Sequence, residues 1–278
     1  MHLGVIMFAT DLTMSIPDLA RAAEERGLSS VFAPEHTHIP VSRRTPPPDG
    51  QAELPDYYRR TLDPLVALGA AAAVTDRIRL GTGVILPAQR EPIVTAKAIA
   101  TLDLLSAGRT VIGIGFGWNE DELAHHGFTL AVRRAAVRER VLAMRALWQD
   151  EEAEFHGEYV DFAPSWSWPK PVQRPAPPIL IGGAAGPKLF AAVAEYADGW
   201  MPIGGGGVRS ALPDLHRAAE AAGRDPATLR VMPFGIIADP AKIDYYAGLG
   251  IDEVVLRLPS GPADAVLPVL DAYASLVG

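Results

Sequence analysis

The chain has 278 residues, of which 49% are hydrophobic, with no cysteine and a net charge of -8 at pH 7. This composition supports a large buried core, excludes disulfides, thiolate metal sites and a cysteine nucleophile, and argues against a general nucleic-acid binder. No apolar run is long enough to cross a membrane and no basic region precedes the first strand-like run, so we expect a cytoplasmic protein without a signal peptide.

Hydrophobic patterns and turn residues predict strands that alternate with helices along the chain. The predicted strands are 3–8, 29–33, 78–86, 110–117, 178–182, 199–203, 230–237 and 253–258. A helix follows each strand, and eight such repeats in this length predict an α/β fold, a (β/α)8 TIM barrel, formed as one domain over residues 1–278. The alternative is a doubly wound open sheet, but no G-x-G-x-x-G fingerprint follows the first strand.

Two long insertions interrupt the regular repeats. Residues 37–62 are rich in proline and polar residues, which predicts a lid-like loop. Residues 151–162 alternate weakly and predict a small hairpin, and the proline- and tryptophan-rich connection 163–178 follows it. The inserted hairpin and connection thus span 151–178, and we expect the loop 37–62 and the segment 163–178 to cover part of a functional face.

Glycines mark the ends of the central strands, 78–86 and 110–117. Neither strand alternates polar with apolar residues, so each is expected to be buried on both faces of a parallel sheet. Glycine weakens a strand unless something must approach the backbone closely. The glycine-bearing ends therefore indicate either a close ligand or close packing.

In a barrel of this kind, catalytic residues lie at the carboxyl ends of the strands. The ends collected there are 8–10, 35–36, 82–84, 115–118, 182–184, 201–203, 235–236 and 257–258. They contain few acidic pairs and no metal-ligand triad, but many small and aromatic residues. This set favours a planar organic cofactor and a small-molecule substrate, with no metal.

One long motif resembles a known family. The run RIRLGTGVILPAQREPIVTAKAIATLDLLSAGRTVIGIGFGWNEDE, with PEHTHIP before it and PPILIGGAAGPKLFAAVAEYADGW after it, resembles the luciferase-like monooxygenase superfamily. Within it the chain is most similar to actinobacterial oxidoreductases that use the deazaflavin coenzyme F420. The resemblance runs from the first strand to GRDP at 223–226 and implies a barrel with insertions, in a protein that is often a homodimer.

The resemblance implies a set of cofactor-binding residues. A bulge in the third strand, often with a non-prolyl cis peptide, backs the ring in the family, and the matching residues here are Thr82, Gly83 and Val84. The fourth strand ends beside the ring, at Gly115, Gly117, Trp118 and Asn119. The turn with Gly182, Gly183, Ala184 and Gly186 opens a helix, where bare amides and the helix dipole suit the cofactor phosphate.

Each of these features also has a structural interpretation. The alternatives are an ordinary glycine bulge at Gly83, a core tryptophan at Trp118 and a tight strand-to-helix turn at 182–186. Lys188 is close enough to the phosphate turn to assist, or is a solvated surface residue.

The resemblance also implies a catalytic pair, Glu35 and His36. An acidic residue followed by histidine lies near the reactive ring edge in such enzymes, and an imidazole suits proton abstraction as a hydride leaves. Here glutamate replaces the commoner aspartate. The alternative for His36 is a hydrogen bond that holds the loop, and we interpret His125 and His126 as structural or exposed.

Other residues are assigned to the mouth of the barrel. Tyr57, Tyr58, Trp166 and Trp168 indicate an apolar or ring-like substrate. Arginines on the loops either bind the polyanionic tail of the coenzyme or form a solvated surface; they are Arg43, Arg44, Arg59, Arg60 and Arg90.

Together these observations predict an oxidoreductase that passes a hydride between a small organic substrate and C5 of F420. The first alternative is an FMN-dependent monooxygenase that uses reduced flavin and O2, in which case a flavin reductase is a partner. The second is a flavin-binding relative without catalysis. A barrel of unrelated chemistry, such as a lyase, is disfavoured because no lysine lies at a strand end.

Overall fold

The structure is a computed structural model that describes residues 1–47, 50 and 53–277. Pro48, Asp49, Gln51 and Ala52 of the predicted lid loop, and Gly278 at the end of the predicted domain, lie outside the described residues.

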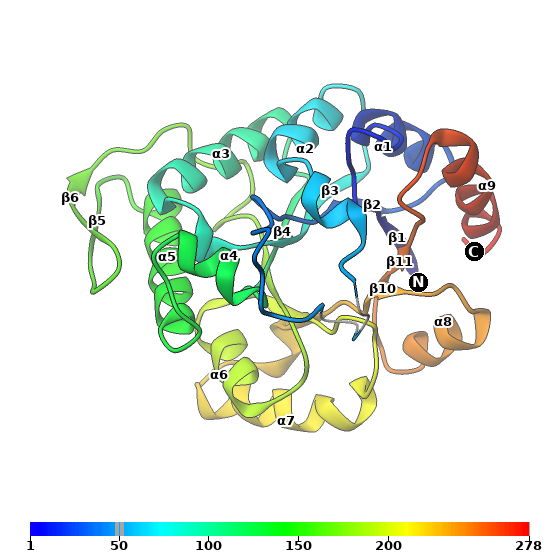
Figure 1. The fold of residues 1–278 in the computed structure, drawn as a ribbon. Coiled ribbons are helices and arrows are strands. Elements are labelled where there is room, and N and C mark those ends of the chain that lie inside the picture. Colours follow the sequence, from blue (N-terminus) through cyan, green and yellow to red (C-terminus); the bar gives the residue numbers. More distant parts are fainter. Residues whose placement is uncertain (48–49, 51–52, 278) are drawn as a thin grey trace.

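Parallel strands form a barrel that helices surround (Figure 1). In spatial order the strands are β11 (Glu253–Arg257), β1 (His2–Ile6), β2 (Ser30–Ala33), β3 (Arg79–Ile85), β4 (Thr110–Ile114), β7 (Ile179–Gly182), β8 (Gly199–Met201), and one strand in two halves, β9 (Arg230–Val231) and β10 (Phe234–Ile236). Their order along the chain matches their order in the sheet, which confirms the predicted (β/α)8 barrel.

The seventh barrel strand is broken at Met232 and Pro233. We predicted one continuous strand over 230–237, and this is wrong because proline has no N–H to donate to a neighbouring strand. The first half pairs with β8 and the second half with β11, where Phe234 lies opposite Val255. The break therefore lets one strand complete the barrel between β8 and β11.

Helices pack around the barrel in chain order. They are α1 (Ile16–Glu25), α2 (Pro64–Ala72), α3 (Pro92–Leu105), α4 (Glu120–His125), α5 (Arg133–Gln149), α6 (Pro187–Tyr196), α7 (Val208–Ala221), α8 (Pro240–Ala247) and α9 (Ala263–Ala274). The predicted helix termini use ordinary capping chemistry. For example, the side chain of Ser15 accepts a hydrogen bond from the Asp18 N–H at 3.2 Å, and Gly108 after α3 has a positive φ of 82°.

The insertions contain more regular structure than we expected. The hairpin forms from β5 (Ala153–His156) and β6 (Asp161–Ser165), so its second strand extends into the predicted connection. Figure 1 shows this hairpin outside the layer of helices. The predicted lid loop contains a 3-10 helix, η1 (Asp56–Arg60), and further 3-10 turns lie at η2 (Pro87–Gln89) and η3 (Pro226–Thr228).

A compact apolar cluster fills the inside of the barrel. It consists of Ile6, Phe32, Val111, Leu180, Met201, Met232, Phe234 and Val255. Phe32 and Phe234 meet edge to face, with ring centroids 5.2 Å apart. The interior of the barrel is thus a packed core. No helix among the described residues is both long and apolar enough to span a membrane.

We expect Gly81→Ala to lower the free energy of unfolding by about 1–3 kcal/mol, as overpacked cores do. The new methyl group would lie 2.2 Å from Cε1 of Phe32, whose ring is fully buried against Phe234. Chemical denaturation measures the loss. The control is Gly69→Ala in α2, where an added methyl meets no described atom within 4 Å; it should leave stability unchanged or raise it by up to about 1 kcal/mol. Equal effects of both substitutions would contradict this packing argument.

Candidate active site

A bulge in β3 forms the base of the site. The pairing of β3 with β4 shifts register between Thr82 and Ile85, and the Gly83–Val84 peptide bond is cis, as predicted. Thr82 is fully buried and its hydroxyl donates to the Gly113 carbonyl at 2.8 Å, so its side chain supports the bulge from behind.

Val84 lies between the ends of two further strands. A Cβ added at Gly115 would lie 2.7 Å from Cγ2 of Val84, and one added at Gly182 would lie 2.9 Å from its Cγ1. We call these three residues the Val84 floor. At Gly83 the corresponding space holds the ring of Phe234, at 2.2 Å. The glycines at 83, 115 and 182 therefore permit close packing of the protein on itself, which leaves half-buried Val84 at the top of the core.

His36 and Glu122 form a hydrogen-bonded pair beside this floor. The Nδ1 of His36 lies 2.9 Å from Oε2 of Glu122, and their side chains are 7% and 1% exposed. A carboxylate only accepts hydrogen bonds, so Nδ1 carries a proton and donates a hydrogen bond to Glu122. Nε2 is the ring nitrogen that Glu122 does not bind. The rings of Tyr58 and Trp118 surround His36, with centroids 5.1 and 5.8 Å away.

Glu122 was not predicted as a site residue. It lies in the first turn of α4, where the side chain of Asn119 caps the helix by accepting its N–H at 3.5 Å. Asparagine followed three residues later by glutamate is a helix-start signal in the sequence. That signal predicts where α4 begins, but only the fold brings Glu122 to the loop after β2.

Three buried polar atoms near this pair have no hydrogen-bond partner among the described residues. They are Gln89 Nε2, Asn119 Nδ2 and Glu122 Oε1. A Cβ added at Gly117, which has a φ of 77°, would lie 4.0 Å from Gln89 Nε2. Buried polar groups are normally hydrogen-bonded, so these atoms indicate a polar ligand or ordered water. The two amide donors suit the carbonyl and ring-nitrogen acceptors of a flavin or a deazaflavin.

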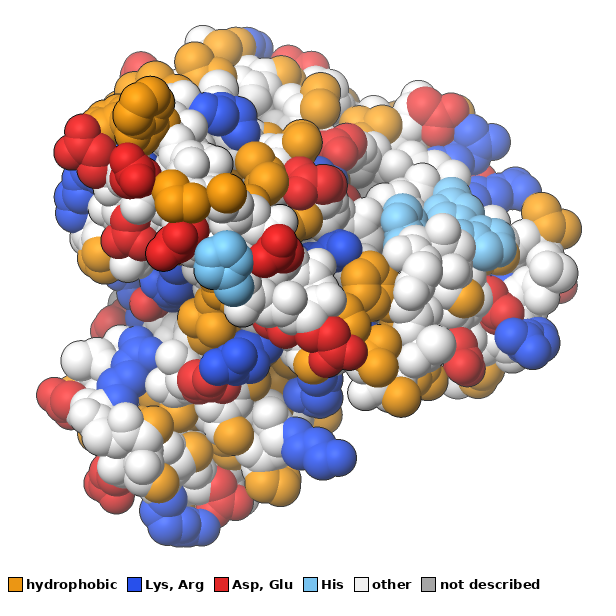
Figure 2. All heavy atoms as spheres, turned by 90° about the vertical axis from the view of Figure 1, so that its left-hand side faces the viewer, with side chains coloured by type: hydrophobic (Ala, Val, Ile, Leu, Met, Phe, Trp, Pro, Cys, Tyr) orange, Lys and Arg blue, Asp and Glu red, His pale blue; other side chains and the backbone are white. Residues whose placement is uncertain are grey.

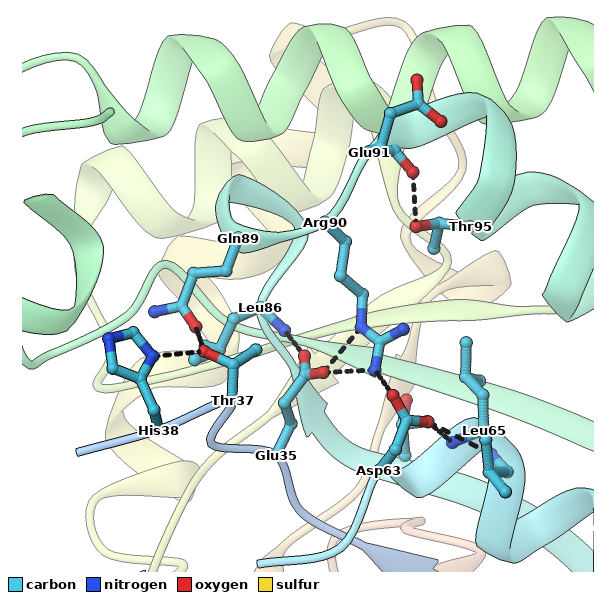
Figure 3. Close-up of polar contacts among 12 residues, drawn as sticks. Glu35, Thr37, His38, Asp63, Leu65, Leu86, Gln89, Arg90, Glu91 and Thr95 are labelled. Atoms are coloured by element: carbon cyan, nitrogen blue, oxygen red, sulfur yellow. Dashed lines mark hydrogen bonds and ion pairs between the residues drawn. The ribbon is translucent and has the colours of Figure 1, made fainter. Parts of the chain in front are cut away.

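Both carboxylate oxygens of Glu35, the other predicted catalytic residue, accept hydrogen bonds from groups of the protein itself (Figure 3). Its Oε2 accepts the Leu86 N–H at 2.7 Å, and its Oε1 accepts Nε of Arg90 at 2.6 Å. Arg90 also donates to Asp63 at 2.6 Å, and Asp63 caps α2. Burial raises the pKa of Glu35, while Arg90 opposes this rise by stabilising the carboxylate. These contacts tie β2 to the segment after β3, immediately beside His36.

A patch of histidines lies on the surface nearby. Nε2 of His38 is 2.8 Å from Nδ1 of His125, and Nε2 of His126 is 3.0 Å from the Thr37 hydroxyl. Figure 2 shows histidine side chains gathered in one place on this face. Burial and the neighbouring His38 lower the pKa of His126. Within the described part of the chain, no group of three or more His, Cys, Asp or Glu is arranged to hold a metal ion.

Most of the loop arginines that were assigned either to the coenzyme tail or to a solvated surface pair with carboxylates of the same chain. Arg44 pairs with Asp121, Arg59 and Arg60 pair with Asp56, and Arg90 pairs with Glu35. Arg43 instead lies over Trp118, 6.0 Å from the ring centroid. The arginine pairs at 43–44 and 59–60 therefore do not form a continuous basic surface.

Aromatic residues line one side of the mouth, though fewer than predicted. Tyr57 lies 4.6 Å from Phe8 and 5.0 Å from Tyr58, measured between ring centroids. Trp166 and Trp168 are 77% and 57% exposed, and the Trp168 carbonyl accepts a hydrogen bond from exposed Lys97 on the outer side of α3. The two tryptophans do not line the mouth because their connection follows the outside of the helices.

The predicted phosphate turn follows β7. Gly183 has a φ of 150°, and its carbonyl accepts the Nε1 proton of Trp200 at 2.9 Å. Gly186 directly precedes α6 and has no side chain to cap it, and Ala184 and Lys188 on either side of it are exposed. The turn starts at Gly182, so it adjoins the Val84 floor.

A family model described as luciferase-like monooxygenase matches residues 12–239. The chain belongs to the luciferase-like monooxygenase family. The uncharacterized protein Rv0953c of Mycobacterium tuberculosis is 45% identical over 278 residues, which covers 99% of this chain and 98% of that relative. An F420-dependent glucose-6-phosphate dehydrogenase of Kineococcus radiotolerans is 34% identical over 221 residues, covering 75% of this chain and 59% of the relative.

Two solved structures have the same fold as this chain. The monooxygenase RslO1 from Streptomyces bottropensis has a TM-score of 0.80 and 23% identity, covering 100% of this chain and 98% of that one. An F420-dependent secondary alcohol dehydrogenase in complex with an F420-acetone adduct has a TM-score of 0.78 and 19% identity, covering 99% and 98%. The named relatives of this luciferase-like chain are oxidoreductases or monooxygenases.

We expect Arg90→Met to lower the free energy of unfolding at neutral pH by about 3–5 kcal/mol, because it leaves a buried carboxylate without its cation. The pKa of Glu35, already raised by burial, then rises further. A carboxyl whose pKa is raised by folding stabilises the fold below its unfolded pKa of about 4.3 and loses that contribution as the pH rises through the folded pKa. The deficit of the variant should therefore shrink in acid.

Denaturation at neutral and acidic pH measures this deficit. The control is Arg44→Met, which removes a pair whose arginine is 83% exposed and should cost at most about 1 kcal/mol. Similar losses in the two variants, or a loss in Arg90→Met that does not change with pH, would disprove the role assigned to Arg90.

Proposed function

We propose that this protein is an oxidoreductase that transfers a hydride between coenzyme F420 and a small organic substrate. The observation that carries the proposal is the buried His36–Glu122 pair beside the Val84 floor. Two similarities support the choice of cofactor, a relative named as an F420-dependent dehydrogenase and a structural neighbour that holds an F420 adduct. Interconversion of an alcohol and a carbonyl compound requires one proton acceptor, and the pair supplies it.

We propose that three groups of residues bind the cofactor. The ring rests on the Val84 floor, with the backbone of Thr82 and Gly83 behind it and Gly117 and Trp118 at its edge. The side-chain amides of Gln89 and Asn119 donate to it. Gly183, Ala184 and Gly186, together with the first turn of α6, receive the phosphate. When bound, F420 supplies a carbon that accepts or returns a hydride and does not activate oxygen.

His36 and Glu122 handle the proton. In the oxidising direction, the hydroxyl proton of the substrate passes to Nε2 of His36 while the hydride leaves the carbon atom that bears the hydroxyl group. The substrate thereby loses two electrons and two hydrogens and becomes a carbonyl compound. Glu122 holds Nδ1–H, which fixes the ring orientation and stabilises the imidazolium that forms. In the reducing direction the same nitrogen returns the proton.

Glu35 positions His36 rather than reacting itself, because both of its oxygens are bound by Arg90 and Leu86. We also propose that residues 1–278 act as one catalytic domain, in which the described part of the segment 37–62 covers the mouth through Tyr57 and Tyr58.

We expect purified protein to bind F420 with submicromolar affinity and FMN at least about tenfold more weakly. Titration of each cofactor, followed by fluorescence, measures both affinities. Gln89→Leu removes one amide donor and should weaken F420 binding about tenfold, the scale of a lost hydrogen bond. Gln149→Leu on the exposed end of α5 is the control and should leave binding unchanged. Submicromolar FMN binding without F420 binding would instead support the monooxygenase alternative.

We expect Glu122→Gln to lower kcat/KM by about 10²–10⁴-fold and to shift the pH dependence of the rate, because a neutral amide stabilises the imidazolium poorly. The assay follows the loss of the F420 absorbance band with a panel of small alcohols. Asp121→Asn is the matched control, since Asp121 lies in the same turn of α4 but pairs with exposed Arg44. Its rate should equal that of the wild type.

Two outcomes would count against this assignment. If Glu122→Gln and His36→Ala both keep the wild-type rate, the pair has only a structural role. If F420 binds but no alcohol is turned over and none perturbs the bound cofactor, the non-catalytic alternative gains support. Recovery of His36→Ala by added imidazole would confirm that a proton acceptor is required there.

A further inference from the structure

A positively charged side chain stands at the inner mouth of the barrel, on β11. Arg257 is the last residue of that strand and lies opposite Ile6 of β1. Side chains two residues apart on a strand share a face, and Val255 belongs to the cluster inside the barrel. Arg257 therefore extends from the inner face of the barrel, above the packed core, and it is exposed.

The surroundings of Arg257 hold it in place without neutralising it. Its Nη2 donates to the Tyr57 hydroxyl at 3.3 Å, and its own carbonyl accepts the Tyr273 hydroxyl at 2.7 Å. The described residues offer it no carboxylate within ion-pair distance. Arg60 and Arg90, in contrast, are both paired with acidic side chains. Among the described residues, Arg257 is therefore a guanidinium without a carboxylate partner, in a chain whose net charge is -8.

The route from Arg257 to the His36–Glu122 pair is lined with aromatic rings. Tyr57 touches Arg257 through its hydroxyl and lies 5.0 Å from Tyr58, which lies 5.1 Å from His36, measured between ring centroids. The proton acceptor and the unpaired cation thus lie at the two ends of one aromatic wall. A guanidinium forms strong charge-assisted hydrogen bonds with oxyanions such as carboxylate or phosphate.

We propose that the substrate carries an oxyanion, a carboxylate or a phosphate monoester, which Arg257 binds while the reacting carbon lies near His36. The hydroxyl of Tyr57 assists as a second donor. This assignment rests on the proposed function for the reaction itself, but the binding of an oxyanion rests only on the contacts of Arg257 and Tyr57. It makes substrate charge, rather than shape only, a determinant of specificity.

The test compares two ligands that differ in charge and little else, phenylacetate and phenylacetamide. Calorimetric titration uses the full chain, first loaded with F420 and then without it. We expect phenylacetate to bind at least about tenfold more tightly than the amide. Arg257→Gln should reduce the affinity for phenylacetate to that for the amide, and leave the amide unchanged. Arg44→Gln, which removes an arginine already paired with Asp121, should retain the preference.

Each result has a distinct meaning. Equal affinities of the wild type for the two ligands, or a preference that survives in Arg257→Gln, would overturn the inference. A loss of F420 affinity of about tenfold in Arg257→Gln, without any preference for phenylacetate, would also overturn it, because Arg257 would then bind the cofactor tail. A preference retained by protein that binds no F420 would support the oxyanion site while contradicting the proposed cofactor.

Discussion

The contact of Val84 with Gly115 and Gly182 is the constraint on which the site depends. Three neighbouring strands, β3, β4 and β7, can place one isopropyl group above the core only because two of them end without a Cβ. Below it, Phe32 and Phe234 fill the barrel. The result is a small apolar surface on a rigid base, since close-packed interiors transmit strain and resist deformation.

Polar groups then surround this surface from separate loops. His36 follows β2, Gln89 follows β3, and Glu122 follows β4. The loops are fixed by charged contacts that lie behind them, above all the buried ion pair of Glu35 with Arg90 and the link from Arg90 to Asp63 at the start of α2. Orientation of His36 thus depends on residues that need not touch a substrate.

Hydrophobic periodicity predicts the barrel well because the eight strand–helix units are local features. The same patterns could not predict the break at Met232–Pro233, which depends on where two neighbours pair with the strand.

The residues of the site were harder to predict. Glycines at 83, 115 and 182 indicated a close approach to the backbone, but not that the side chains of Val84 and Phe234 make it. The arginines at 44, 59, 60 and 90 were assigned either to an anion or to a solvated surface, and all four pair with carboxylates of the chain. Arg59 and Arg60 pair with nearby Asp56, whereas the partners of Arg44 and Arg90 are distant in sequence, and sequence spacing carries no information on such long-range pairs. Glu122 was missed for the same reason.

The short helix α4 brings Glu122 to His36, although the floor is built entirely from strand ends. The partner of His36 and the residues of the floor therefore belong to different elements of the fold. A change confined to residues 119–125 can replace the partner of His36 while Val84, Gly115 and Gly182 keep their packing.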